Sequence, residues 1–483
     1  MPDFINNSIL GLEYIIPELI LTGALILNIL FLFLNREKLH RILFYLNLII
    51  LVLISTYTIL QIPNSITIKP FYSLLIQDKT TNIYKLLIDI SAILCLVLFK
   101  LDKDLKNNKI NDLLMMYPAM ILGLHLLVSA NNWLIFIVVI EMVSLSGYLL
   151  VSYVKQKKSS EAGIKYLLIG LIITAVMLYA ISILYALHGT LDWRTLNLTN
   201  HRYLHLVACV FLMLGIGFKL GIFPVHFWMP DVFEGVPISI ATYIGILPKI
   251  GATLLLFRFW TLLVTSLTNF EFLLVIITIS TLIIGNLFAI NQNYIKRLIA
   301  YSSIGHTGFI IMILTTLSPI NKLVIPTVSF YVITYSLATF SIFFTLLSLS
   351  NQRINSTGFI ENYAGLAKTH PIASINLLIA FISLIGLPIT AGFWAKVYIF
   401  STVMKYGISY SITTLLVVAV ICTILSLFYY FRWIKVMFLG IDKIERHSHT
   451  THSFILESVA SLLSLLIILL GFIPQILWKH LML

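Results

Sequence analysis

The stretch from Tyr203 to Pro230 reads YLHLVACVFLMLGIGFKLGIFPVHFWMP. The stretch is long and apolar enough to cross a bilayer as a helix, yet three glycines and Pro224 surround Lys219 within it. Pro224 removes a backbone donor and clashes with the carbonyl group of Leu220, four residues earlier. Inside a membrane the freed carbonyl groups need partners, which water or a cationic side chain can supply. We therefore expect a membrane-spanning helix that is interrupted beside a buried charge.

A second stretch repeats this pattern. Residues 386–394 read GLPITAGFW, and the first stretch contains GIFPVHFW, so each has glycine, then proline, then Phe-Trp. Each also has a lysine close by, Lys219 before the first and Lys396 after the second. Paired helices interrupted by glycine and proline mark the transport sites of inverted-repeat transporters. The pattern predicts helix breaks at Pro224 and Pro388.

The composition indicates a membrane protein. Of the 483 residues, 59% are hydrophobic and 10% are charged, and the mean hydropathy is +1.01. Soluble domains have about 45–50% apolar and about 25% charged residues. These values exclude a soluble enzyme, a disordered protein and a secreted disulfide scaffold. A membrane β-barrel is excluded because its strands would alternate polar and apolar residues.

The charge and the cysteines point to no cofactor or nucleic acid. Most basic residues behind the net charge of +12 lie in short loops between apolar runs, which favours a topology signal over a nucleic-acid-binding surface. Cys95, Cys209 and Cys422 are far apart in apolar runs, a spacing that suits neither zinc nor an iron–sulfur cluster. The sequence also has no nucleotide-binding loop or haem-ligand pair, so we expect no cofactor, no metal and no redox chemistry in this chain.

Hydropathy predicts an all-α polytopic membrane protein with about fourteen spans. Their expected cores are residues 14–34, 41–61, 80–100, 111–129, 133–154, 161–188, 203–230, 237–260, 271–290, 294–316, 323–349, 371–404, 408–438 and 454–478. The seventh, twelfth and thirteenth are longer than a straight span needs, so we expect each to be tilted, bent or broken.

The loops between the spans differ in their content of lysine and arginine. The odd-numbered loops hold Arg36, Lys38, Arg41, Lys100, Lys103, Lys106, Lys109, Lys155, Lys157, Lys158, Lys296, Arg297, Arg353, Lys368, Arg432, Lys435, Lys443 and Arg446. The even-numbered loops hold Lys69, Lys79, Arg194, Arg202, Lys322 and Lys405. The positive-inside rule places the odd loops in the matrix or cytoplasm. With fourteen spans, both termini then face the intermembrane space or periplasm.

Four ionisable residues fall deep in these spans: Glu141, Lys219, Lys249 and Lys396. An isolated charge at bilayer depth costs at least ~2.5–3.5 kcal/mol and is functional by default. At about 1.5 Å per residue, Glu141 lies roughly 12 Å into its span and Lys249 roughly 18 Å. The structural alternatives are a protonated Glu141 bonded to a neighbouring helix, and lysines at 219 and 396 that reach the interface.

These groups suggest a mechanism. Desolvation disfavours a charged lysine and a nearby carboxylate favours it. A Glu141–Lys219 pair that forms and breaks would therefore switch the proton affinity of the lysine. A row of such lysines, linked by water and histidine, could pass protons sideways and release them across the membrane.

Lys165 and His226 are further candidates. Glu161 precedes Lys165 by four residues, which is the spacing of a stabilising ion pair at a helix end, so a structural role competes with proton transfer. His226 follows Lys219 by seven residues and shares its face if helical geometry persists across the proline.

His306 lies in a polar island of the tenth span, YSSIGHTG at residues 301–308. A satisfied core histidine and a proton relay are both open there. Glu18 and Asp89 also fall in spans, but no pattern surrounds them and we assign them no role.

Five segments carry a family resemblance. They are EMVSLSGY at 141–148, EAGIKYLLIG at 161–170, the run from Gly217 to Pro237, QNYIKRLIAYSS at 292–303 and GLPITAGFWAK at 386–396. Together they resemble the antiporter-like subunits of respiratory complex I over essentially the whole chain.

The resemblance implies a fourteen-helix fold with two inverted five-helix repeats and discontinuous helices 7 and 12. Residues 1–110 would form the first three helices, 111–262 the first repeat, 263–440 the second repeat and 441–483 the last helix.

The resemblance also implies a proton-translocating subunit of an NADH:ubiquinone oxidoreductase. Glu141 and Lys219 would form the switching pair, Lys249 the central relay and Lys396 the exit-side lysine. Lys165 and His226 fall on family motif positions, and His306 aligns with a histidine of the tenth-helix motif. The partners would be other membrane-arm subunits, especially neighbouring antiporter-like ones, together with lipids. NADH, FMN, iron–sulfur clusters and ubiquinone would belong to partner subunits.

Two alternatives stay open at this stage. One is a subunit of a multisubunit sodium/proton antiporter, and the other is a structural membrane subunit that does not pump. Abundant Ile, Asn, Lys, Phe and Tyr suggest an AT-rich genome, so the expected location is the mitochondrial inner membrane, with the bacterial plasma membrane as the alternative.

Overall fold

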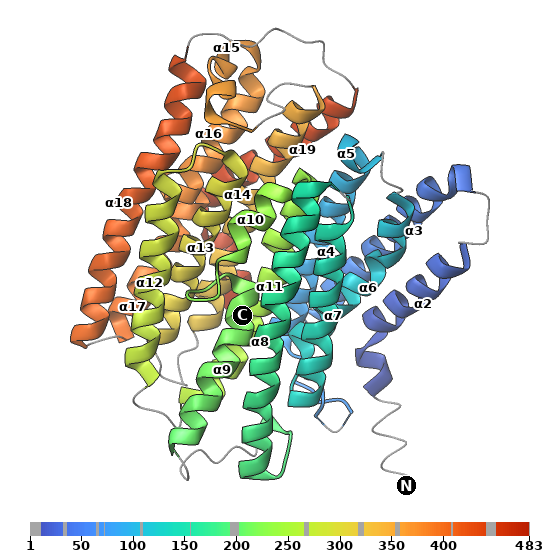
Figure 1. The fold of residues 1–483 in the computed structure, drawn as a ribbon, viewed down its shortest axis with the longest axis vertical. Coiled ribbons are helices and arrows are strands. Elements are labelled where there is room, and N and C mark those ends of the chain that lie inside the picture. The colour runs from blue at the N-terminus through green and yellow to red at the C-terminus, as the bar shows by residue number, and fades with distance from the viewer. Residues whose placement is uncertain are drawn as a thin grey trace. The chain divides into compact units, whose positions relative to one another are not determined.

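The computed structural model describes twelve stretches of the chain (Figure 1). They are residues 11–31, 36–63, 67–71, 73–106, 110–154, 156–193, 202–264, 270–316, 323–352, 358–406, 409–440 and 451–482. Every regular element in these stretches is a helix, and extended pairing there is limited to isolated bridges. The predicted all-α fold is confirmed.

The chain divides into two compact units, residues 1–219 with 243–267, and residues 220–242 with 268–483. The helices of the first unit are α2 (Ile16–Leu30), α3 (Arg36–Gln61), α4 (Lys79–Leu101), α5 (Lys103–Lys106), α6 (Ile110–Ser129), α7 (Trp133–Ser152), α8 (Lys157–His188), α9 (Arg202–Leu220) and most of α11 (Ile238–Val264). The finer division into two inverted repeats stays a prediction.

The second unit holds the remaining helices. They are α10 (Trp228–Gly235), α12 (Phe270–Ile290), α13 (Ile295–Met312), η3 (Ile313–Thr316), α14 (Val324–Asn351), η4 (Ile360–Tyr363), α15 (Leu366–Thr369), α16 (Pro371–Ile385), α17 (Ala391–Tyr406), α18 (Tyr410–Leu439), α19 (Thr451–Phe472) and α20 (Gln475–Met482).

Among the described residues, twelve helices are long and apolar enough to cross a membrane, or thirteen if one bent pair counts as a span. They correspond to twelve of the expected spans. The expected span 14–34 is represented by α2, which has only 15 residues. The expected span 371–404 is divided between α16 and α17, because the chain turns at residues 386–390. The expected thirteenth span is the unbroken 30-residue helix α18.

The loop pattern behind the predicted orientation is only partly visible. Backbone positions of Lys109, Lys155, Arg194, Lys322, Arg353, Lys443 and Arg446 lie outside the described residues, as do the side chains of Arg36, Lys38, Lys106 and Arg202. The orientation of the termini therefore stays a prediction.

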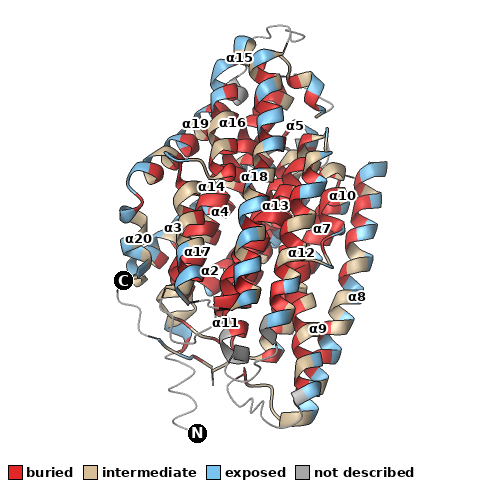
Figure 2. Ribbon diagram, turned by 90° about the vertical axis from the view of Figure 1, so that its left-hand side faces the viewer, coloured by how far each residue is buried: buried red, intermediate tan, exposed pale blue. Residues whose placement is uncertain are grey.

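Burial differs sharply between helices (Figure 2). The apolar window of α13 is 94% buried, whereas that of α8 is 28% buried. Exposed apolar side chains such as Ile172 on α8 suit a lipid environment or a neighbouring subunit. The polar island around His306, in contrast, is enclosed within its unit.

Local signals fix several helix ends. Asn132 caps α7 by accepting a hydrogen bond from the N–H of Leu134 at 2.8 Å. Gly189 ends α8 with φ of 68°, a conformation that glycine adopts without strain. Asp78 caps α4 by accepting from the N–H of Thr81 at 2.7 Å, and Arg258 of α11 lies 3.1 Å from its carboxylate.

The Asp78 cap makes stability depend on pH. Burial raises the pKa of Asp78, but Arg258 and the hydrogen bonds from Thr80 and Thr81 outweigh it, so this pKa lies below its ordinary value. The stabilisation is therefore present above the unfolded pKa of about 3.9 and is lost as pH falls through the lower folded pKa. We expect Asp78→Asn to lower the melting temperature at neutral pH, and the difference from wild type to shrink below about pH 4. A difference in melting temperature between the two proteins that stays constant across this pH range would contradict this role of Asp78.

Candidate functional site

Both predicted helix breaks are present, and each begins at a glycine with positive φ. α9 ends at Leu220, and Gly221 has φ of 73°. α16 ends at Ile385, and Gly386 has φ of 83°. In the second break Ile389 also has a positive φ, 79°, which is a strained conformation for a β-branched residue.

Hydroxyl groups satisfy the backbone of the first break. The Thr307 hydroxyl on α13 donates to the Leu220 carbonyl at 2.9 Å. The Phe223 N–H donates to the Thr281 hydroxyl on α12 at 3.1 Å. The carbonyl that Pro224 frees is thus paired by a threonine, where the sequence suggested water or a cation.

We expect Thr307→Val to lower the stability of the assembled protein by about 1–3 kcal/mol, since the Leu220 carbonyl loses this partner. The readout is the melting temperature in mild detergent. Thr345→Val is the matched control, because the Thr345 hydroxyl donates to the Ser341 carbonyl of its own helix and has no second hydrogen-bond partner among the residues that the structure describes. Equal shifts for the two variants would show that the break does not depend on Thr307.

In the first unit, Glu141 and Lys219 lie within electrostatic reach of each other without direct contact. The Glu141 carboxylate on α7 accepts a hydrogen bond from Thr174 of α8 at 2.7 Å. Lys219 is 3% exposed, and its ammonium group donates to the Tyr166 hydroxyl at 3.4 Å. The charge of Glu141 still acts on Lys219. The arrangement corresponds to the open form of the predicted pair, whose switching role stays a prediction.

Aromatic rings surround the Lys219 ammonium group. It lies 5.4 Å from the ring centres of Tyr148 and of Tyr166, which is cation–π distance. Tyr148 reaches this place because Gly170 on α8 has no side chain; a Cβ there would overlap the Tyr148 hydroxyl. This packing gives a physical reason for Tyr148 at the end of the α7 motif and for Gly170 at the end of the α8 motif.

The other predicted residues of this unit differ in exposure. Lys249 follows Pro248 inside α11 and is 2% exposed, so it is buried as predicted. Lys165 instead lies on the exposed face of α8 and pairs with Glu161 at 2.9 Å. That is the geometry of the helix-surface ion pair that competed with proton transfer in the sequence, and a relay role for Lys165 stays a prediction.

In the second unit, His306 and Lys396 line one cavity. α13, α14, α16 and α17 converge on it, and its volume of about 10 Å³ is near the minimum for one water molecule. The Lys396 ammonium group donates to the Ile385 carbonyl, at the end of α16, at 2.7 Å. His306 Nδ1 lies 2.7 Å from the Tyr331 hydroxyl.

Further hydroxyl groups of the second unit form hydrogen bonds at this cavity and beyond it. Tyr335 lines it and donates to Ser303 at 2.8 Å. Ser302 is hydrogen-bonded to Tyr430 of α18, and Tyr429 donates to Asn286 of α12 at 3.2 Å. These residues were not predicted from the sequence. Tyr331 and Tyr335 stand one helical turn apart in an apolar span, and that spacing was the available signal.

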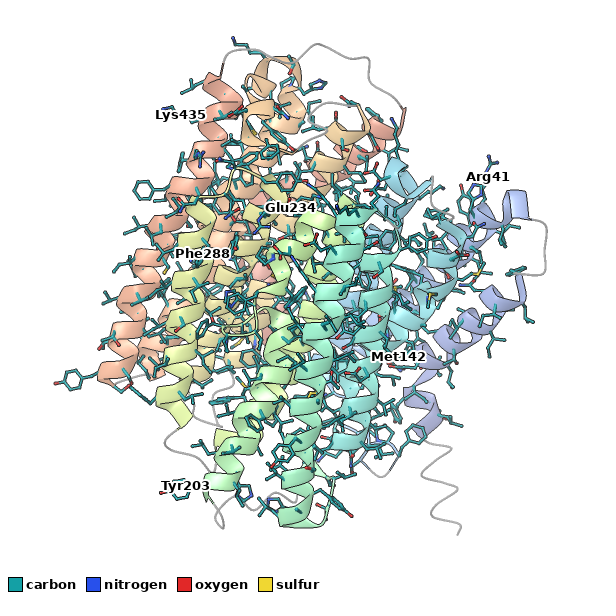
Figure 3. All side chains as sticks on the ribbon, viewed as in Figure 1. Arg41, Met142, Tyr203, Glu234, Phe288 and Lys435 are labelled. Atoms are coloured by element: carbon teal, nitrogen blue, oxygen red, sulfur yellow. The ribbon has the colours of Figure 1, made fainter. Side chains whose placement is uncertain are left out.

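His226 follows Pro224 in the chain, between the end of α9 and the start of α10, and its side chain is buried. Its ring centre lies 4.2 Å from that of Phe227, and among the described residues its Nδ1 has no hydrogen-bond partner. Nearby, Glu234 of α10 (labelled in Figure 3) pairs with Arg297 of α13 at 2.8 Å. This ion pair fixes α10 against α13 and so fixes one side of the break.

The sequence of this chain matches a known protein family. A sequence model of the NADH:quinone oxidoreductase/Mrp antiporter family, transmembrane region, matches residues 130–426. The chain belongs to this family. NADH-quinone oxidoreductase subunit N of Acidithiobacillus ferrooxidans is 31% identical over 485 residues, with 97% of each chain covered. Subunit N 1 of Thermodesulfovibrio yellowstonii is 33% identical over 444 residues, with 90% of this chain and 92% of the relative covered.

Solved structures of this antiporter-like family have the same fold. A chain of respiratory complex I from Thermus thermophilus with bound aureothin has a TM-score of 0.80 at 25% identity, over 96% of this chain and 99% of the other. A chain of the Mrp complex from Dietzia sp. has a TM-score of 0.83 at 15% identity, over 98% and 96%; this second likeness concerns the fold alone. The predicted resemblance to complex I antiporter-like subunits is confirmed.

Proposed function

We propose that this chain translocates protons in the membrane arm of an NADH:quinone oxidoreductase, as the counterpart of bacterial subunit N. The observation that carries the proposal is the burial of Lys219, Lys249 and Lys396, each at most 7% exposed. Lys219 and Lys249 lie in helices long and apolar enough to cross a membrane, and Lys396 lies in the 16-residue helix α17. A buried lysine charge is costly, so its retention at three places supports a role in proton transfer.

The geometry suggests two parts of the proton path. In the first unit, Glu141 biases Lys219, which can exchange a proton through the Tyr166 hydroxyl. In the second unit, Lys396 and His306 share a cavity that can admit water. Lys249 is proposed as the central relay, and Lys165 and His226 as accessory sites.

Electron transfer belongs to other subunits in this proposal. NADH, FMN, iron–sulfur clusters and ubiquinone would be bound by those subunits, and this chain would bind no cofactor. Its partners would be other membrane-arm subunits, especially neighbouring antiporter-like ones. The membrane would be the mitochondrial inner membrane or a bacterial plasma membrane; the bacterial relatives support the second.

Mild-detergent purification tests this function. We expect the tagged chain to migrate with a multisubunit assembly that oxidises NADH and reduces quinone, and mass spectrometry identifies its neighbours. A chain that instead exchanges sodium for protons in liposomes, without any NADH-oxidising partner, would overturn the proposal in favour of the antiporter alternative, whose fold is equally similar.

A further inference from the structure

Four ionisable side chains meet between α2, α4 and α6, before residue 130 where the family match begins. The Lys85 ammonium group lies 2.5 Å from Glu18 Oε1. His125 Nε2 lies 2.9 Å from Asp89 Oδ1, and His125 Nδ1 lies 3.8 Å from Glu18 Oε1. The imidazole ring therefore stands between two carboxylates. We call these four residues the N-terminal cluster.

The charges of the N-terminal cluster do not balance without an added proton. All four side chains are at most 4% exposed. With both carboxylates ionised, Lys85 protonated and His125 neutral, the net charge is −1. An uncompensated buried charge is strongly destabilising. One further proton makes the cluster neutral.

Unpartnered atoms indicate where this proton resides. Among the described residues, both Glu18 carboxylate oxygens, Asp89 Oδ2 and His125 Nδ1 have no hydrogen-bond partner, although Glu18 Oε1 is ion-paired with Lys85. A neutral imidazole has a single N–H and can donate to one carboxylate, whereas an imidazolium donates from both nitrogens. A protonated His125 would therefore donate from Nε2 to Asp89 and, at the same time, direct its Nδ1–H toward Glu18.

The neighbouring helices bring phenols to this cluster. Tyr57 of α3 interacts electrostatically with Glu18, and Tyr117 of α6 with Asp89. Both hydroxyls donate to backbone carbonyls, Tyr57 to Glu13 at 3.2 Å and Tyr117 to Ala92 at 2.5 Å. Arg258 of α11 is paired with Asp78 at the start of α4. The charge balance is therefore set by the four cluster residues.

We propose that Glu18, Lys85, Asp89 and His125 form a second proton-binding site, which holds one exchangeable proton between His125 and the two carboxylates. When the proton moves from His125 to Asp89, the Nε2–H bond breaks, the Oδ1–H bond forms, and the imidazole becomes neutral. At 1.5 Å per residue, His125 lies roughly 6 Å from the end of α6 and Lys85 roughly 9 Å from the start of α4, so the exchanging proton would pass along roughly one to two helical turns.

This site can be tested by infrared spectroscopy of the purified complex whose histidines carry an isotope label. Difference spectra compare the complex in water and in D2O. In wild type we expect one imidazolium signal that shifts when water is replaced by D2O. Asp89→Asn leaves Glu18 and Lys85 balanced, so that signal should be lost. His125→Gln should instead produce a new carboxylic acid signal, because the proton moves to a carboxylate.

Glu361→Gln is the control, since Glu361 is an exposed carboxylate in η4 of the other unit; it should change neither signal. An imidazolium signal that survives Asp89→Asn, or that does not shift in D2O, would overturn the proposal. Because the two variants give opposite signatures, either one decides the question if the other does not assemble. The spectra report proton occupancy, so their outcome is separate from whether the chain pumps.

Discussion

Lys219→Ala is expected to reduce NADH-driven proton pumping at least about tenfold, because a positioned proton-transfer group is typically worth 10²–10⁴-fold. The side chain is buried against Tyr148 and Tyr166 and lies within reach of the Glu141 charge. Alanine removes the only atom of this side chain that binds a proton. The measurement is proton uptake per NADH oxidised in liposomes that contain the purified complex, with a native gel to check assembly.

Lys100→Ala is the matched control for this experiment. Lys100 also places its ammonium group over aromatic rings, 3.8 Å from the ring centre of Phe44, but it lies at the end of α4. We expect this variant to pump normally. A normal pumping ratio in assembled Lys219→Ala complexes would remove Lys219 from the proton path.

Gly392→Ala is expected to destabilise the second helix break by about 1–3 kcal/mol or more, the usual cost of forcing extra volume into a packed site. A Cβ at this position of α17 would overlap the backbone carbonyl of Ser383 on α16. Backbone atoms move less easily than a flexible side chain, so α16 and α17 would separate at the cavity that holds Lys396. The readouts are the melting temperature and the yield of assembled complex.

Gly23→Ala supplies the opposite expectation. Gly23 lies in α2, and a Cβ there would meet no atom within 4 Å. Alanine is favoured over glycine inside a helix by roughly 0.5–1 kcal/mol, so this variant should be neutral or slightly stabilising. Equal losses from the two substitutions would contradict the packing described for Gly392.

The sequence predicted the spans and both breaks because these depend on local properties. A long apolar run specifies a membrane helix without reference to its neighbours, and Pro224 and Pro388 act on the backbone around them. The sequence did not predict the 119° bend between residues 360–369 and 371–385. Pro371 is compatible with the start of a helix as well as with a bend, so that choice depends on packing.

The site was predicted less completely, since contacts between distant residues leave little trace in one sequence. Lys219, Lys249 and Lys396 stood out because each is a charge in an apolar run. Glu18 and Asp89 were charges of the same kind, yet they received no role, because the contacts of Glu18 with Lys85 and of Asp89 with His125 join residues far apart in sequence. Tyr331 and Tyr335 were missed because tyrosine is common in apolar spans and its hydroxyl partners are set by the fold.

The hydroxyl groups around His306 have a consequence for timing. A hydroxyl that hands on one proton while receiving another finishes with its O–H bond pointing the opposite way. In the proposed proton path, every phenol and serine hydroxyl that took part, such as Tyr335 and Ser303, would have to rotate back before the next proton could follow. The rate of proton transfer in this region would then be limited by the rotation of the O–H bonds. That limit would apply to every proton and would not depend on the driving force.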